Sequence, residues 1–333
     1  MRSRRVLFFV LKVLLSAGLL YVLLRGGQLG RVVAETRGRF HLLPFVVGLL
    51  AFAVSNILGG CQWNLLLRAQ GIHIGFKRAI ILYYVGLFFS NFLPANIGGD
   101  VMKVVDVYRS SGKGGGAVAA TLIDRATGLA MLALMACVAA VPTYSVLGGE
   151  PFLLLIPLFF LFFLGGALMI LSRRAAAWSL RMIGRLPVRW FRVKAESIVA
   201  AIFQYRATRR TLLAALLIAL PVQTLRILVH YFAARSIGID APAVYFFLFI
   251  PIVAVFIALP ISINGIGVRE TLGVFLYAMI GIQQELAFSI SFLAYIIGVL
   301  VSLAGGFFFV ARSGVVRAGA PPTVPLKADG ESR

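Results

Sequence analysis

Acidic residues are scarce in this sequence, and charged residues of either sign are few. Its 333 residues include 11 Asp or Glu and 32 Lys or Arg, which gives a formal net charge of +21 and a charged fraction of 13%. Hydrophobic residues make up 61% of the chain, against roughly 45 to 50% in soluble globular proteins. This composition excludes a single soluble domain and a disordered chain, and it indicates a membrane protein with several transmembrane helices.

Cysteine and histidine are also rare, and their positions exclude several kinds of site. Cys61 and Cys137 lie in separate apolar runs, so the sequence has neither a disulfide framework nor a CxxC pair. The histidines His41, His73 and His230 are too far apart in the sequence for an i, i+4 metal site. We therefore expect no metal and no cofactor. The sequence also contains no P-loop, G-x-S-x-G or H-E-x-x-H motif, so ATP hydrolysis and these hydrolase chemistries have no basis in it.

Apolar runs divide the chain into membrane segments. A bilayer core about 30 Å thick requires about 20 apolar residues per helix. Six runs satisfy this condition, namely 6–24, 43–67, 117–141, 151–172, 211–234 and 286–311. Three shorter runs are bounded by Pro, Gly and Asn, namely 79–94, 243–261 and 266–281. We interpret 6–24 as an uncleaved first helix, because no small-residue cleavage site follows it.

The distribution of positive charge predicts the topology. Residues 173–210 carry ten Lys or Arg and one acidic residue, so the positive-inside rule places this loop in the cytoplasm. Apolar residues alternate with these cations, and we expect the loop to lie on the inner membrane surface and not to bind nucleic acid. Both termini are then cytoplasmic. Parity requires residues 68–116 to begin and end inside and residues 235–285 to begin and end outside, so we predict one re-entrant hairpin in each segment.

The two predicted hairpins break at similar motifs. Each break has a Leu-Pro pair followed by Asn, glycines and charged residues. Broken helices that enter from opposite sides and meet near the midplane are typical of inverted repeats, which in transporters form the substrate site. We therefore predict an all-α, polytopic membrane helical bundle with two inverted re-entrant broken-helix hairpins. In the alternative interpretation, Pro and Gly merely kink packed helices, and 243–261 and 266–281 are two full crossings.

The predicted organisation is one transmembrane domain over residues 1–312. It has a first half (1–172), the basic cytoplasmic loop (173–210) and a second half (211–312), followed by a disordered cytoplasmic tail (313–333). We interpret the tyrosines that flank the two breaks, Tyr83, Tyr84 and Tyr245, as interfacial anchors.

Ionisable side chains within the apolar runs are the first candidates for a site, because each costs about 2.5 to 3.5 kcal/mol to insert. Asp124 and Arg125 lie about 10 Å into their predicted helix, where an interhelical ion pair or snorkelling is the structural alternative. Arg226 lies in the middle of 211–234, with Gln223 and His230 on the same helix face. Its guanidinium would fit a phosphate.

The alternative for Arg226 is a structural pairing with Glu270 or Asp100. The residues after each break are further candidates, since helix N-termini attract anions and glycine lets a headgroup approach the backbone. In the alternative interpretation, the acidic residues complement the helix dipoles and the glycines allow close packing. The full set of candidate substrate-binding residues is Asn91, Pro94, Asn96, Gly98, Gly99, Asp100, Lys103, Asp124, Arg125, Arg226, His230, Pro260, Asn264, Gly265, Gly267, Arg269 and Glu270.

The two break motifs also resemble a known family. NFLPANIGGDVMK (residues 91–103) and LPISINGIGVRE (residues 259–270), in this order among this many membrane helices, resemble the flippase-like transmembrane region of lysylphosphatidylglycerol synthases. The resemblance covers residues 6–312. It implies a bacterial inner-membrane protein that translocates a lipid with a polar or aminoacylated headgroup. Bifunctional members also carry a cytosolic aminoacyltransferase domain, which we do not expect here, so the synthase activity is not carried over.

The sequence therefore favours a lipid translocator and not an enzyme. The expected partners are membrane lipids with a phosphate-bearing headgroup, and a homo-oligomer or an association with a lipid-modifying enzyme stays open. Three other functions also stay open: an ion-coupled transporter of a small anion, a non-catalytic assembly partner, and a membrane transferase acting on a lipid-linked phosphate or sugar. The transferase would need a general base, for which Asp100, Asp124 or Glu270 is available.

Overall fold

The computed structural model describes residues 38–92, 98–147, 153, 155–185, 188–258 and 267–318. All regular structure within these ranges is helical, so the predicted all-α class is confirmed there. The elements are α3 (Leu42–Ala69), α4 (Phe76–Phe92), α5 (Gly98–Ser111), α6 (Gly114–Leu147), α7 (Leu155–Leu171), α8 (Arg173–Gly184), α9 (Arg189–Gln204), the 3₁₀ turn η2 (Tyr205–Thr208), α10 (Arg209–Ser236), α11 (Ala243–Ala258), α12 (Val268–Ala278) and α13 (Gln284–Ala318).

Four helical stretches in the described ranges are long and apolar enough to cross a membrane. They are Leu42–Ala69, Gly114–Leu147, Arg192–Ser236 and Gln284–Ala311, and they contain the predicted runs 43–67, 117–141, 211–234 and 286–311. The predicted run 151–172 forms α7, whose 17 residues extend about 25 Å, slightly less than a bilayer core of about 30 Å. The predicted helix 6–24 lies outside the described residues.

The described part of the basic segment 173–210, which the sequence predicts to be a cytoplasmic loop between membrane segments, is largely helical. It comprises α8, α9, η2 and the first residues of α10. The apolar residues recur among the cations with a helical period, and both helices are amphipathic. At the start of α8, the Oγ atom of Ser172 accepts a hydrogen bond from the N–H of Ala175 and caps the helix. Six of the ten Lys or Arg of this segment therefore lie on two short helices, α8 and α9.

Two series of four helices have the same order and similar lengths. The helices α3, α4, α5 and α6 have 28, 17, 14 and 34 residues, and α10, α11, α12 and α13 have 28, 16, 11 and 35 residues. Within each series, consecutive helices pack against one another, and the first helix also packs against the fourth. The contacts between the series are equivalent as well. The second helix of each series packs on the fourth helix of the other, as α4 on α13 and α11 on α6. The first helix of each series also packs on the fourth helix of the other, as α3 on α13 and α10 on α6.

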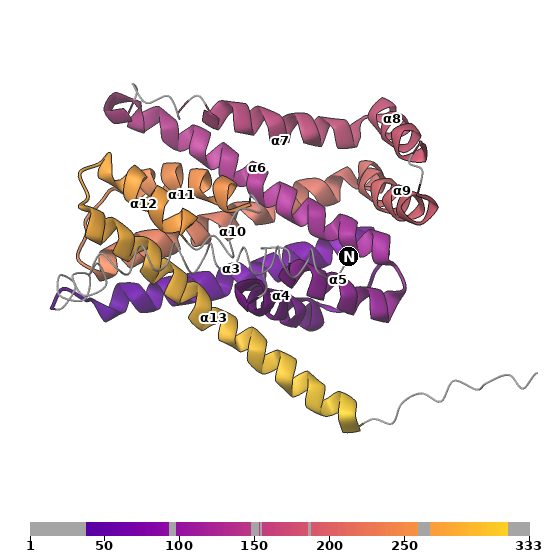
Figure 1. Ribbon diagram of the computed structural model, residues 1–333, viewed down its shortest axis with the longest axis horizontal. Coiled ribbons are helices and arrows are strands. Elements are labelled where there is room, and N and C mark those ends of the chain that lie inside the picture. The colour runs from indigo at the N-terminus through magenta and orange to yellow at the C-terminus, as the bar shows by residue number, and fades with distance from the viewer. Residues whose placement is uncertain are drawn as a thin grey trace, which may run out of the picture.

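The first helices of the two series, α3 and α10, lie antiparallel in the middle of the bundle (Figure 1). At one end, the N–H of His41 donates a hydrogen bond to the carbonyl of Ser236 over 2.7 Å. At the other end, the Tyr205 hydroxyl donates to the carbonyl of Leu66 over 2.8 Å. Helices α8 and α9 lie at this second end of the bundle, and the C-terminal part of α13 extends away from the bundle (Figure 1). The two series therefore run in opposite directions.

In the first series, α4 and α5 fold back on each other as an antiparallel pair. Gly99, in the first turn of α5, packs directly on α4, where an added Cβ would overlap the Gly86 carbonyl oxygen and the Ser90 side chain. Near the other end of the pair, Arg78 and Asp106 form an ion pair of 3.5 Å. The residues between the two helices, 93–97, lie outside the described ranges.

In the second series, α11 and α12 form the corresponding pair. The Tyr277 ring, near the end of α12, lies 5.5 Å from the Phe246 ring and 5.8 Å from the Phe249 ring, both near the start of α11. These rings belong to a large apolar core, and a second core surrounds Trp63 in the first series. Residues 259–266, between α11 and α12, are not among those described. In both series, a short helix pair is therefore placed between two long helices.

Candidate functional site

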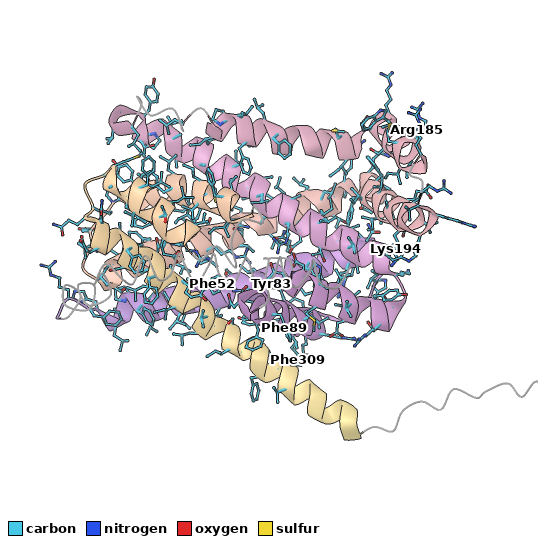
Figure 2. The ribbon with its side chains drawn as sticks, viewed as in Figure 1. Phe52, Tyr83, Phe89, Arg185, Lys194 and Phe309 are labelled. Carbon is cyan, nitrogen blue, oxygen red and sulfur yellow. The ribbon has the colours of Figure 1, made fainter. Side chains whose placement is uncertain are left out.

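A cavity of about 420 Å³ lies among the eight helices of the two series and is lined by several ionisable side chains. All eight helices contribute to its lining. The ionisable residues in the lining, tyrosines aside, are Asp100, Lys103, Asp124, Arg125, Arg226, His230 and Arg269. Four cationic side chains therefore share the cavity with two carboxylates. Figure 2 shows Phe52 and Tyr83, which also line it, in the middle of the bundle, and Arg185 and Lys194 at the end formed by α8 and α9.

Asp100 forms ion pairs with two of the cations. Its Oδ1 atom lies 2.9 Å from Lys103 Nζ, and its Oδ2 atom pairs with Arg125 of α6. Lys103 is 6% exposed, and its ammonium group lies 4.5 Å from the ring centre of Tyr83 and 5.2 Å from that of Trp63. The interhelical ion pair considered for Arg125 is therefore present, and it joins the start of α5 to the middle of α6.

Asp124 is the second carboxylate in the cavity lining. It is 8% exposed, and Lys103 and Arg226 are the cations that interact with it most strongly. In the described part of the chain, no cation lies within ion-pairing distance of its oxygens. Asp124 thus lies in the field of two cations and forms no ion pair with any described residue.

On α10, the polar stripe predicted from the sequence faces the interior. Gln223, Arg226 and His230 all line the cavity. Arg226 Nη2 donates a hydrogen bond of 3.3 Å to the Tyr83 hydroxyl. Arg226 Nε and His230 Nδ1 are buried and have no hydrogen-bond partner among the described residues. Because an unsatisfied buried polar group costs about 1 to 3 kcal/mol, these two nitrogens favour a ligand that supplies hydrogen-bonding groups to both.

Arg226 does not form an ion pair with Asp100 or Glu270, the two partners considered for it in the structural alternative. Asp100 pairs with Lys103 and Arg125 instead. Glu270 is 5% exposed, and its Oε2 atom accepts a hydrogen bond of 2.7 Å from the N–H of Gly267. This contact caps α12 and agrees with the alternative in which the acidic residue complements the helix N-terminus.

The second helix pair contributes one cation to the site. Arg269, next to Glu270 in the sequence, lines the cavity, and its guanidinium carbon lies 5.3 Å from the centre of the Tyr295 ring. Gly267 and Glu270 do not line the cavity. Gly267 has a φ of +85°, a left-handed conformation that glycine adopts without strain.

In the first helix pair, Asn91 lines the cavity and donates a hydrogen bond of 2.8 Å to Ser302 Oγ. Gly98 and Gly99 do not line it. The close contact of Gly99 with α4 agrees with the alternative in which these glycines allow close packing. The other candidates from the break motifs lie outside the described residues: Pro94, Asn96, Pro260, Asn264 and Gly265.

Several cavity residues are missing from the sequence-based candidates. Asn56 and Gln62 line the cavity and lie within the apolar run 43–67. A polar residue inside an apolar run is a signal of a site, and the sequence-based candidates did not include these two. The interpretation of Tyr83 and Tyr84 as interfacial anchors was wrong. Tyr83 lines the cavity, and Tyr84 is buried and donates a hydrogen bond to the carbonyl of Ala53.

The remainder of the lining is mostly apolar, which gives the cavity an amphipathic character. The apolar residues include Phe52, Leu87, Leu129, Leu132, Val222, Ile227, Val229, Ile250, Val253, Ala254, Ile257 and Ala294. Charged groups surrounded by apolar walls interact more strongly than they would in water.

Comparison with known proteins gives a family match. A family model described as "Lysylphosphatidylglycerol synthase TM region" matches residues 9–306. Among curated proteins, the "UPF0104 membrane protein PH1989" of Pyrococcus horikoshii is 24% identical over 105 residues, which are 31% of this chain and 31% of that protein. The chain therefore matches less than a third of that relative's length. No solved structure matches the chain.

Proposed function

Because this chain belongs to the family of the lysylphosphatidylglycerol synthase TM region, we propose that it translocates a lipid with a phosphate-bearing headgroup across a membrane. The proposed membrane is the bacterial inner membrane, and the proposed substrate is an anionic or aminoacylated lipid. One observation carries the proposal: four cationic side chains and two carboxylates line a single cavity inside a bundle of apolar helices. Such groups are expensive at membrane depth and mark substrate pathways.

The size and chemistry of the cavity suit a phosphate-bearing headgroup. A volume of about 420 Å³ lies near the lower end of the roughly 300 to 1,000 Å³ of ligand pockets, which suits a headgroup better than a whole lipid. The acyl chains would then stay in the bilayer. Arg226 offers a buried Nε–H that has no partner in the part of the chain that the structure describes, and a guanidinium matches phosphate oxygens in geometry and charge.

We further propose that α4–α5 and α11–α12 are re-entrant hairpins of an inverted repeat. The matching lengths and contacts of the two helix series support this relation. Asp100, at the start of α5, pairs with Arg125, which is 125 − 114 = 11 residues from the start of α6, or about 17 Å along that helix. Arg269, at the start of α12, contacts Tyr295, which is 295 − 284 = 11 residues from the start of α13. The starts of α5 and α12 would thus lie about halfway across a bilayer core of about 30 Å.

The proposed orientation has the α8–α9 end of the bundle in the cytoplasm. Segments predicted to be inside meet at this end: Lys113 Nζ donates a hydrogen bond to the carbonyl of Gly71, and Gln70 Nε2 donates one to the carbonyl of Ala201. The basic helices α8 and α9 satisfy the positive-inside rule in this orientation. Both chain termini would then be cytoplasmic, as the sequence predicts.

The proposal is tested by reconstituting the full chain in liposomes that contain phosphatidylglycerol with a fluorescent acyl chain. A membrane-impermeant reductant then reports which lipids have reached the outer leaflet. We expect transfer faster than in protein-free vesicles, and a large loss in Arg226→Gln. Arg235→Gln is the matched control, because Arg235 lies on the same helix but pairs with exposed Asp240 outside the cavity.

Two outcomes would contradict the proposal. The first is transfer no faster than in protein-free vesicles for every anionic or aminoacylated headgroup tried. The second is uptake of soluble phosphate without any lipid transfer, which would favour an ion-coupled transporter of a small anion.

A further inference from the structure

We propose that Asp124 is a proton-binding site, and that one proton enters the cavity with each phosphate headgroup. The proposal rests on the proposed function, because it concerns the same cavity and the same phosphate ligand. The proposed function does not say which ion is coupled to lipid movement, and this inference identifies that ion as a proton.

The two carboxylates of the cavity differ in their partners. Both oxygens of Asp100 are engaged, one by Lys103 and the other by Arg125. Asp124 is also buried and lines the cavity, but no cation in the described residues lies within ion-pairing distance of it. Of the two cations that act on it most strongly, Lys103 is already paired with Asp100. Asp124 is therefore the carboxylate of the cavity that balances the charge of Arg226.

A phosphate headgroup would compete with Asp124 for Arg226. The negative charge of Asp124 balances the guanidinium, and this balance allows a buried carboxylate to stay ionised. A phosphate bound at Arg226 would bring a second anion next to Asp124, and like charges in a buried site favour protonation of one of them. The neutral carboxylic acid could then donate its O–H to a phosphate oxygen.

The charge balance of this step is simple. One proton moves from water to a carboxylate oxygen of Asp124 as one phosphodiester with a single negative charge enters. The net charge of the cavity stays the same, so binding and release need no uncompensated charge inside the membrane. On release, the proton leaves Asp124, and Asp124 again balances Arg226.

Other titratable or charged groups around Asp124 set the controls for this proposal. They are Tyr83 on α4, Asp100 and Lys103 on α5, Arg125 on α6, Arg226 and His230 on α10, and Tyr205 in η2. The cavity residue that α3 contributes nearby, Gln62, does not titrate. His230 is the group of this set whose ordinary pKa is closest to neutral pH, so it must be separated from Asp124 by experiment.

The test is the affinity of the full chain, in detergent, for a short-chain phosphatidylglycerol over a pH series on both sides of neutrality. Uptake of one proton per lipid predicts that the dissociation constant falls by up to about tenfold for each pH unit of acidification. We expect Asp124→Asn to bind with an affinity that does not change with pH, because the amide stays neutral. His230→Gln should keep the pH dependence, and so should the matched control Asp106→Asn on α5, whose carboxylate pairs with Arg78 outside the cavity.

A second measurement uses the unmodified protein. Addition of the lipid to protein in weak buffer should remove about one proton per bound lipid from solution, as followed with a pH-sensitive dye. Binding without pH dependence or proton uptake would overturn the role of Asp124 and leave the proposed function intact. Retention of the pH dependence in Asp124→Asn, or its loss in His230→Gln, would also overturn that role. Absence of saturable binding at every pH would instead overturn the proposed function itself, together with this inference.

Discussion

Replacing Asp100 with Asn removes the counter-charge of a buried lysine. Lys103 is 6% exposed, and breaking a buried ion pair by removing one partner costs about 3 to 5 kcal/mol. The amide oxygen of Asn can still accept a hydrogen bond, and Lys103 keeps its contacts with two aromatic rings, which offset about 1 kcal/mol. The side chain of Arg125 is 41% exposed, so the loss of its partner adds at most about 1 kcal/mol. We therefore expect Asp100→Asn to lower the free energy of unfolding by about 2 to 5 kcal/mol.

Equilibrium unfolding in mixed micelles, followed by circular dichroism, measures this change. The control is Asp106→Asn on the same helix, because Asp106 and Arg78 form a partly exposed pair of 3.5 Å that should contribute less than about 1 kcal/mol. The double variant with Lys103→Met should recover much of the loss, since it removes the unpaired buried charge. The reasoning would be refuted if Asp100→Asn were no more destabilising than Asp106→Asn, or if Lys103→Met gave no recovery.

Two further predictions concern other parts of the bundle. Gly99→Ala should destabilise the protein by about 1 to 3 kcal/mol, because its Cβ would overlap the α4 backbone. In Gly166→Ala of α7, no atom of the described residues lies within 4 Å of the new Cβ, so thermal unfolding should show no loss. Equal effects of the two changes would contradict the α4–α5 packing. Brominated anionic lipids should quench the fluorescence of exposed Trp178 and Trp190 in single-tryptophan variants, and should quench buried Trp63 far less. Quenching of Trp63 alone would show that α8 and α9 lie away from the membrane surface.

The long helices could be predicted because a membrane-spanning helix needs a long apolar run, and such runs are visible without knowledge of the neighbours. The four spans α3, α6, α10 and α13 follow the predicted runs closely. The prediction of 173–210 as a cytoplasmic loop made no statement about its secondary structure, although apolar residues recur in α8 and α9 with a helical period. The positive charge of this segment predicts its side of the membrane and says nothing of its secondary structure.

The partners of the charged residues could not be predicted, because they depend on how deep each helix lies against the next. Asp100 and Asp124 were equivalent candidates in the sequence, yet one forms two ion pairs and the other none among the described residues. Arg269 and Glu270 are neighbours in the chain, but Arg269 lines the cavity and Glu270 caps its own helix. The side of a broken helix that faces a cavity is set by tertiary packing. In contrast, the spacing of Gln223, Arg226 and His230 was sufficient to predict that they share one face.

The number of anionic lipids that stay bound to the protein tests most directly whether the cavity holds a phosphate headgroup. Native mass spectrometry of the full chain, extracted gently from membranes, should find one phosphatidylglycerol or similar lipid retained. Arg226→Gln should lose this lipid, and Arg235→Gln on the same helix should keep it. Equal retention by both variants, or retention of uncharged lipids only, would contradict a phosphate site at Arg226.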